Sequence, residues 1–192
     1  MNQKISAEHS FLNPEKAVSA AKIREGMTVA DFGAGAGFFT LEAARAVGPS
    51  GHVWAVDVHR DLLSRLKRLA EHNGLHNVEI VAGDCEAHCG SMLADHSIDM
   101  AIVANILFSA KNKEKIAEEV WRVLKGGKKG THGRTGRVLV VDWKRARRGF
   151  GPHPDRVMSY DEARALFERN GFKFKEEVSG GAYHWAFVAE KL

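Results

Sequence analysis

Three aspartates, each at the end of an apolar run, are the side chains of this sequence best suited to holding a polar ligand. Asp31 lies in VADFGAGAGFFT, Asp57 in VWAVDV and Asp84 in VAGDCEA. A carboxylate offers about four acceptor sites, so it can hold two hydroxyls at once or an amino group. Each aspartate alone is equally well explained as a turn or cap residue. Three at successive run ends predict a common ligand.

A glycine-rich loop follows the first of these aspartates. Gly33, Gly35 and Gly37 occupy alternate positions, and glycine lets a backbone approach a ligand where a Cβ would collide. One glycine would indicate only a tight turn, whereas three indicate a binding loop. A dinucleotide fingerprint is excluded because its last glycine would be Phe38 or Thr40, and a phosphate loop lacks its Lys-Ser or Lys-Thr pair. The adjacent carboxylate also disfavours phosphate, so the ligand is expected to be uncharged or cationic here.

The elements that position these residues alternate between strand-like and helical patterns. Strand-like runs occupy 27–32, 52–57, 78–83, 98–104, 137–143, 172–178 and 183–191, and helical periods occupy 60–74 and 111–127. Such alternation is typical of parallel strands covered by helices on both faces. The last two runs are joined by SGGA, which predicts an antiparallel hairpin. The expected fold is α/β: a doubly wound, Rossmann-like seven-stranded sheet, mostly parallel, with an antiparallel C-terminal strand.

The helical periods carry apolar stripes and end signals. The stripe of 60–74 consists of Leu62, Leu63, Leu66, Leu69 and Ala70, and that of 111–127 consists of Ile116, Val120, Val123 and Leu124. A last helix is predicted from Ser159, which has capping-box spacing to Glu162, to a stop at Gly171.

Length and composition fit one globular domain. The 192 residues are 44% hydrophobic and 27% charged, and no stretch reaches the roughly 18 apolar residues of a membrane helix. The start lacks the apolar core of a secretion signal, and two cysteines give no disulfide framework. We expect a cytoplasmic protein without membrane insertion. Its single domain would span 1–192, with an N-terminal lid segment at 1–26 and a basic loop at 125–137.

The glycine loop and the later aspartates together resemble the class I S-adenosylmethionine-dependent methyltransferases. VADFGAGAGFFT is similar to their first motif, an acidic residue followed by G-x-G-x-G. VWAVDV, VAGDCEA, and RVLKGGKK before GRVLVVDW stand where the family has its later motifs. The resemblance covers nearly the whole chain and is greatest to small members related to quinone-biosynthesis and arsenite methyltransferases. It implies S-adenosylmethionine as cofactor and S-adenosylhomocysteine as product.

The resemblance also implies a role for each cofactor-binding residue. Asp57 would accept hydrogen bonds from both ribose hydroxyls, and Asp84 from the adenine amino group. Val58 would contact the adenine face, and the backbone N–H of Cys85 would face a ring nitrogen. Asp31 and the backbone of Gly33 and Gly35 would receive the ammonium end of the methionine portion. Ala34, Gly37 and Asn105 are further candidates for cofactor binding.

The acceptor is harder to infer, because transfer from a sulfonium depends mainly on positioning. The end of the fourth strand, the loop after the fifth and the N-terminal segment are expected to form the acceptor pocket. Asn105 and Phe108 are the candidates for positioning the acceptor. Further pocket candidates are Asp142, Trp143, His9 and Phe11.

Charge and metal-ligand types leave alternatives open. The net charge is +4, and the segment from Lys125 to Arg148 holds nine Lys or Arg with the single acid Asp142. Such a segment is compatible with a nucleic-acid or protein substrate, but its cations flank both ends of the fifth strand, and we favour a small-molecule acceptor. A non-catalytic S-adenosylmethionine-binding protein is a further alternative. Cys85, His88 and Cys89 lack the paired spacing of a zinc site, so no metal is expected.

Overall fold

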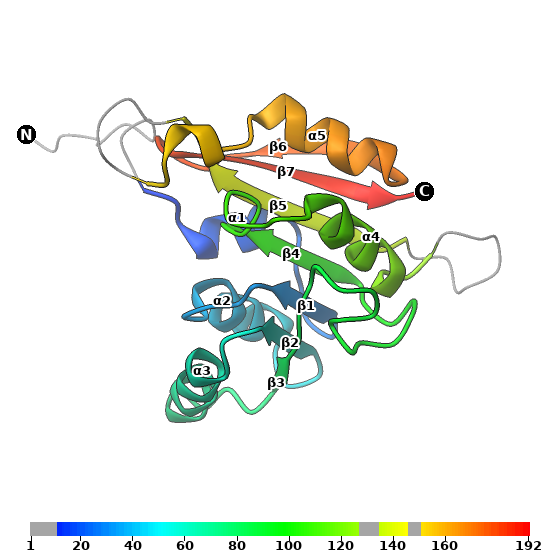
Figure 1. Ribbon diagram of the computed structural model, residues 1–192. Coiled ribbons are helices and arrows are strands. Elements are labelled where there is room, and N and C mark those ends of the chain that lie inside the picture. Colours follow the sequence, from blue (N-terminus) through cyan, green and yellow to red (C-terminus); the bar gives the residue numbers. More distant parts are fainter. Residues whose placement is uncertain (1–10, 127–134, 146–150) are drawn as a thin grey trace, which may run out of the picture.

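The computed structural model describes residues 11–126, 135–145 and 151–192, and its strands form one sheet (Figure 1). The strands are β1 (Thr28–Phe32), β2 (His52–Asp57), β3 (Val78–Ala82), β4 (Met100–Ala104), β5 (Arg137–Trp143), β6 (Phe172–Val178) and β7 (His184–Lys191). Their order across the seven-stranded sheet is β3-β2-β1-β4-β5-β7-β6. The predicted fold class is therefore confirmed.

Strand direction follows the prediction as well. β1 to β5 run parallel to one another, and β7 is antiparallel to both of its neighbours, β5 and β6. The fourth predicted run extends too far at its start. Ile98 precedes β4 and forms only an isolated bridge with Leu124.

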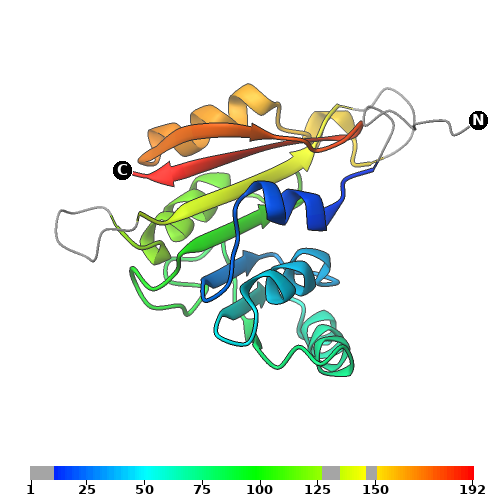
Figure 2. The ribbon, with the colours of Figure 1, turned by 180° about the vertical axis from the view of Figure 1, so that it is seen from behind.

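Helices cover both faces of the sheet. They are α1 (Pro14–Ala20), α2 (Phe38–Val47), α3 (Arg60–His72), α4 (Lys113–Val123) and α5 (Tyr160–Arg169), with a short 3-10 turn at Pro154–Arg156. α4 and α5 lie on the face seen in Figure 1, and α1, α2 and α3 lie on the face seen in Figure 2.

Alternating side chains of the strands separate two hydrophobic cores. In β5, Val138 and Val140 belong to the core under α4 and α5, whereas Leu139 and Val141 belong to the core under α1 and α2. Successive side chains of a strand point to opposite faces, so a strand buried on both sides is apolar throughout. This explains why the central strands read as unbroken apolar runs.

The helices confirm most of the sequence patterns and correct one. The Ser159 and Glu162 capping box is present, with hydrogen bonds of 3.2 and 2.7 Å. In α3, Leu63, Leu66 and Ala70 are buried as predicted, but Leu69 is 43% exposed. Leu69 therefore lies outside the buried face of α3. Its inclusion in the apolar stripe was wrong.

The strand order creates the place for a ligand. β1 leads through α2 to β2 on one side, whereas β4 pairs with β1 on the other side. At such a switch point the loops after the two strands separate and leave a crevice at the carboxyl edge of the sheet. The three predicted aspartates lie at this edge: Asp31 is near the end of β1, Asp57 ends β2, and Asp84 follows β3. No helix among the described residues is long and apolar enough to span a membrane.

Candidate active site

The glycine loop after β1 is fixed by backbone hydrogen bonds. The amides of Gly33 and Ala34 both donate to the Val56 carbonyl, at 2.8 and 3.1 Å, and the amide of Gly37 donates to the Ala34 carbonyl. Gly33, Gly35 and Gly37 have φ of +72°, +52° and +85°. These values lie in the left-handed region that favours glycine, so the loop conformation depends on all three.

The three glycines differ in what surrounds them. A Cβ on Gly33 would lie 2.2 Å from Ile106 Cγ2, and one on Gly37 would lie 2.1 Å from Leu66 Cδ1. A Cβ on Gly35 would meet only the Gly33 carbonyl oxygen, at 3.9 Å. The first and last glycines therefore allow close contact with the chain itself. Only Gly35 leaves open space that a ligand could fill.

Asp57, at the end of β2, is buried and connects the glycine loop to β2. Its Oδ2 accepts a hydrogen bond from the Gly35 amide at 2.9 Å, and its Oδ1 accepts from the His59 amide at 2.9 Å. His59 Nδ1 lies 2.8 Å from the same Oδ1. With about four acceptor sites on a carboxylate, few remain for further donors. Holding two ribose hydroxyls requires the exposed His59 ring to leave Asp57.

The predicted adenosine-binding residues meet at a small cavity of about 170 Å³. Asp57, Val58, Asp84 and Cys85 all line it, as does Gly33. Val58 is 57% exposed, so an apolar side chain stands uncovered at the rim. Cys85 is buried, and burial raises the pKa of its thiol to about 12. Among the described residues no group of His, Cys, Asp and Glu could hold a metal ion.

The loop that carries Asp84 is held by a buried carboxylate that sequence analysis missed. Glu119 of α4 accepts hydrogen bonds from the Ser91 amide at 3.0 Å and from the Ser91 hydroxyl at 2.5 Å. Arg122 donates to both oxygens of Glu119. A glutamate on a charged helix resembles a solvated residue, so only its neighbours in space reveal the role.

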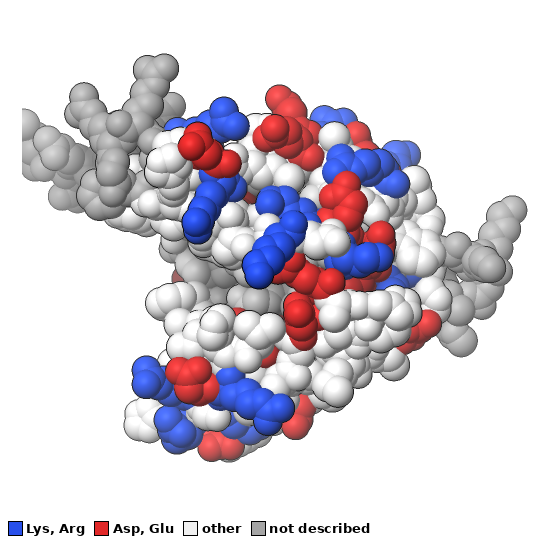
Figure 3. Space-filling model, in the orientation of Figure 1, with Lys and Arg blue, Asp and Glu red and all other residues white. Residues whose placement is uncertain are grey.

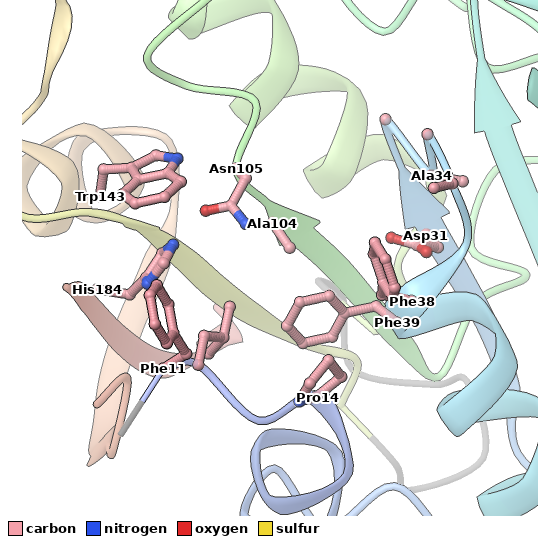
Figure 4. A pocket seen from close by; sticks show the side chains of 14 residues that line it. Phe11, Pro14, Asp31, Ala34, Phe38, Phe39, Ala104, Asn105, Trp143 and His184 are labelled. Carbon is pink, nitrogen blue, oxygen red and sulfur yellow. The ribbon is translucent and has the colours of Figure 1, made fainter. Parts of the chain in front are cut away.

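A second, larger cavity of about 580 Å³ is shown in Figure 4. It shares the lining residue Gly33 with the first cavity. Its predicted lining residues are Phe11, Asp31, Gly33, Ala34, Gly35, Asn105 and Trp143, and those not predicted are Leu12, Pro14, Ala36, Phe38, Phe39, Ala104 and His184. Phe38 is 72% exposed at this site. Gly37 lines neither cavity and is the N-cap of α2. His9 lies outside the described residues.

Asp31 is the carboxylate of the larger cavity. It is buried, and its Oδ2 accepts a hydrogen bond of 2.6 Å from the Thr40 hydroxyl of α2. Burial raises the pKa of Asp31 to about 6 despite this hydrogen bond. A buried carboxylate at the cavity wall would gain from a cationic partner.

Asn105 follows β4 in a conformation that is unusual for a residue other than glycine. Its φ is +57°, and its side-chain Oδ1 is buried without a hydrogen-bond partner among the described residues. Strained backbone and unpaired buried polar atoms cluster at functional sites. That Asn105 contacts a ligand stays a prediction.

Phe108 and Asp142 have other surroundings than predicted. Asp142 is buried, and its carboxylate accepts hydrogen bonds from the Trp143 amide at 2.7 Å and the Phe108 amide at 3.3 Å. Neither residue is among those that line these two cavities. Asp142 instead joins the loop after β4 to the end of β5, and burial raises its pKa to about 6.

His184 is the residue of the larger cavity that sequence analysis missed most clearly. It opens β7 and is paired in register with Trp143 of β5, with the two ring centroids 4.1 Å apart. The hairpin was predicted, but its register against β5 was not. Only that register brings a histidine from the last strand to the cavity.

S-adenosylmethionine fits these two cavities. The smaller one offers an acceptor carboxylate and apolar rim for an adenosine group, and the larger one offers Asp31 for an ammonium group. Gly35 leaves room for a ligand beside the loop that separates them. The residues present therefore suit the cofactor that the sequence resemblance implies.

Known proteins share both sequence and fold with this chain. The family described as "Methyltransferase domain" matches residues 23–131. The arsenite methyltransferase of Halobacterium salinarum is 29% identical, over 81% of this chain and 40% of that protein. The ubiquinone/menaquinone biosynthesis C-methyltransferase UbiE of Klebsiella pneumoniae is 30% identical, over 67% of this chain and 47% of that protein. The chain thus spans less than half the length of these curated relatives.

A solved structure covers nearly all of the fold. The crystal structure of a SAM dependent methyltransferase from Aquifex aeolicus superposes with a TM-score of 0.83 at 28% identity, covering 95% of this chain and 91% of that one. With the family matching more than half of its residues and this fold shared throughout, the chain belongs to the class I S-adenosylmethionine-dependent methyltransferases.

Proposed function

We propose that this chain transfers the methyl group of S-adenosylmethionine to a small-molecule acceptor. The observation that carries the proposal is the pair of cavities that meet at Gly33. The smaller one suits adenosine. The larger one extends from Asp31 to Trp143 and His184, and its volume of about 580 Å³ leaves space beyond a methionine group.

The residues of the two cavities would bind and orient the reactants. When bound, S-adenosylmethionine supplies an electrophilic methyl carbon. Asp57 and Asp84 would hold the adenosine end, Asp31 would hold the ammonium group, and Asn105 would position the acceptor. Apolar walls from Phe39 and Trp143 would exclude water. Holding the acceptor in line with the methyl carbon supplies most of the rate enhancement in such a displacement.

The surface supports a small acceptor more than a nucleic acid. Lys125 forms an ion pair of 2.8 Å with Asp99, and Lys144 donates to the Gly181 carbonyl. On the face shown in Figure 3, Lys and Arg alternate with Asp and Glu and form no continuous basic band. Five of the nine cations between Lys125 and Arg148 lie in 127–134 and 146–150, outside the described residues.

Two measurements test the proposal together. Calorimetry should show binding of S-adenosylmethionine and S-adenosylhomocysteine but not of NAD. Incubation with a donor carrying a radiolabelled methyl group should then place label in the low-molecular-weight fraction of a cell extract. Label found only in RNA, DNA or protein would contradict the small-molecule acceptor. Binding without transfer to any fraction would favour the non-catalytic alternative.

A further inference from the structure

We propose that His184, with Trp143 and Asn105, forms the acceptor-binding end of the large cavity, and that the acceptor is an uncharged, planar molecule offering an O–H or N–H group to the His184 imidazole. This inference rests on the proposed methyl transfer and names the chemical class of its acceptor. It assigns a binding role to a residue of the last strand, far from the sequence motifs of the cofactor site.

The unpaired nitrogens of His184 are the first support. The residue is 4% exposed, and neither Nδ1 nor Nε2 has a hydrogen-bond partner among the described residues. Buried polar groups are almost always hydrogen-bonded, because leaving one unpaired destabilises the fold. A histidine that lines a cavity and lacks a partner within the described chain is therefore suited to a partner on the ligand.

The protonation state of His184 defines what that partner must offer. Burial and, to a smaller extent, the nearby charge of Lys144 together lower the pKa of the imidazole to about 4. The ring is therefore neutral near pH 7, with one nitrogen accepting and one donating. The unpaired Oδ1 of Asn105 is a second acceptor. In Figure 4 the Asn105 amide points toward the Trp143 and His184 pair, so acceptor atoms converge on one region.

Aromatic walls define the shape of the acceptor. The Trp143 ring lies at 40° to that of His184, and a Cβ on Gly151 would lie only 2.7 Å from Trp143 Cε3. Because Gly151 has no Cβ, its backbone packs closely against the Trp143 indole. Phe39 lines the same cavity, and Phe11 reaches it while stacking on Tyr183 at a centroid distance of 4.9 Å. Flat apolar surfaces of this kind favour a planar ligand.

The cavity disfavours charge on the acceptor. Burial moves both titratable groups of its described lining toward their neutral forms, raising the pKa of Asp31 and lowering that of His184. An anionic acceptor would lose its hydration and would share the cavity with the Asp31 carboxylate. Asp31 and Ala34 lie across the cavity from His184 in Figure 4. The end of the large cavity at Asp31 therefore suits a cationic group of the cofactor. The end at His184 suits an uncharged acceptor.

Three matched probes test the inference: naphthol, its methyl ether and naphthoate. They share one aromatic frame and offer a donor, no donor and a negative charge. Binding to the full chain saturated with S-adenosylhomocysteine would be measured by calorimetry. We expect naphthol to bind about tenfold more tightly than the ether, the effect of one buried hydrogen bond, and naphthoate to bind most weakly.

Variants of His184 then separate hydrogen bonding from packing. His184→Phe should abolish the preference for naphthol over the ether, and His184→Gln, which keeps an acceptor, should retain most of it. His72→Phe, the same change at an exposed position of α3, should leave it intact. Thermal melting and S-adenosylhomocysteine affinity report whether each variant is folded. If His184→Phe does not fold, His184→Gln compared with His184→Leu carries the test.

The outcomes distinguish this inference from the proposed function. An unchanged naphthol preference in His184→Phe, tightest binding of naphthoate, or no binding of any probe would overturn the acceptor assignment while S-adenosylhomocysteine still bound. Loss of S-adenosylhomocysteine binding by the unmodified chain would instead contradict the proposed function.

Discussion

Individual residues of the proposed cofactor site form hydrogen bonds with one another and with their neighbours. Asp57 accepts three hydrogen bonds, from Gly35 and His59, and Asp31 accepts one from Thr40. Such contacts orient the carboxylates before a ligand arrives, which reduces the entropy lost on binding. They also compete with the ligand, and His59 is the competitor that can move because its ring is exposed.

Asp57 and its neighbour give a paired prediction. Asp57→Ala should weaken S-adenosylhomocysteine binding by about 1.5–3 kcal/mol, the range for hydrogen bonds to a charged group. His59→Ala removes a competing donor from the same carboxylate. Its affinity should equal that of the unmodified chain or exceed it slightly. Calorimetry measures both, and equal affinity in Asp57→Ala would contradict the assigned role.

Asp31 predicts a stability that depends on pH. Because burial raises its folded pKa to about 6 from an ordinary 3.8, the fold favours the protonated form. The stabilising contribution of protonated Asp31 is therefore fully present below about pH 4 and is lost as the pH rises to about 6. Asp31→Asn keeps an acceptor for Thr40 and avoids this loss, which corresponds to about 3 kcal/mol for a shift of about two units.

The measurement is urea unfolding of both proteins at pH 4 and pH 8. The variant should gain stability over the unmodified chain at pH 8 and little at pH 4, while binding S-adenosylmethionine more weakly. A constant difference across this pH range would show that Asp31 ionises normally. Using the difference between the two proteins removes the titration of other groups, including Asp142.

At the level of elements, the loop between β1 and α2 places two tightly packed glycines on either side of the one that we propose for binding. Because Gly33 has no Cβ, Ile106 from the loop after β4 can pack against it, and Leu66 of α3 packs against Gly37 in the same way. These contacts join the loop to two elements distant in sequence. Gly35, between them, has no such contact and lines the large cavity.

Alanine substitutions should separate the two roles. Gly33→Ala should cost roughly 2–4 kcal/mol of stability through overpacking and backbone strain. In an Ile106→Ala background the cost should fall toward about 1 kcal/mol, the strain alone. Gly35→Ala should cost about 1 kcal/mol in stability but lose most of its S-adenosylhomocysteine affinity. Urea unfolding measures the stability of each variant, and calorimetry measures its affinity for S-adenosylhomocysteine. A larger loss of stability in Gly35→Ala than in Gly33→Ala would contradict these roles.

For the molecule as a whole, the sequence predicts strands better than contacts between distant strands. The bounds of β2, β5 and β6 equal the predicted ranges. Each of these strands is an apolar or alternating run that begins directly after a glycine. His184 was missed because its place depends on the register of β7 against β5. The distinction between Gly33 and Gly35 depends on Ile106, which is more than 70 residues away in the sequence. Local patterns carry no information on such pairings.

The charge distribution over the molecule predicts weak binding to nucleic acids. Filter-binding titrations with RNA and DNA, single- and double-stranded, should give dissociation constants no tighter than about micromolar at physiological salt. Lys144→Ala with Arg145→Ala should change methyl transfer little. Submicromolar binding with a salt dependence of several phosphates, lost together with transfer in that double variant, would favour a polymer substrate.

The strand order has a consequence for assembly of the protein. β7 follows β6 in sequence but lies between β5 and β6. A partly folded chain in which the hairpin has not yet docked therefore exposes the edge of β5, whose sequence RVLVVDW is mostly apolar. Unpaired apolar edges template aggregation. In the finished sheet the edge strand on this side is β6, whose sequence FKFKEEV carries charges of both signs. Docking of the hairpin thus replaces an unpaired apolar edge with a charged one. Aggregation during refolding should therefore compete with the docking of this hairpin onto β5.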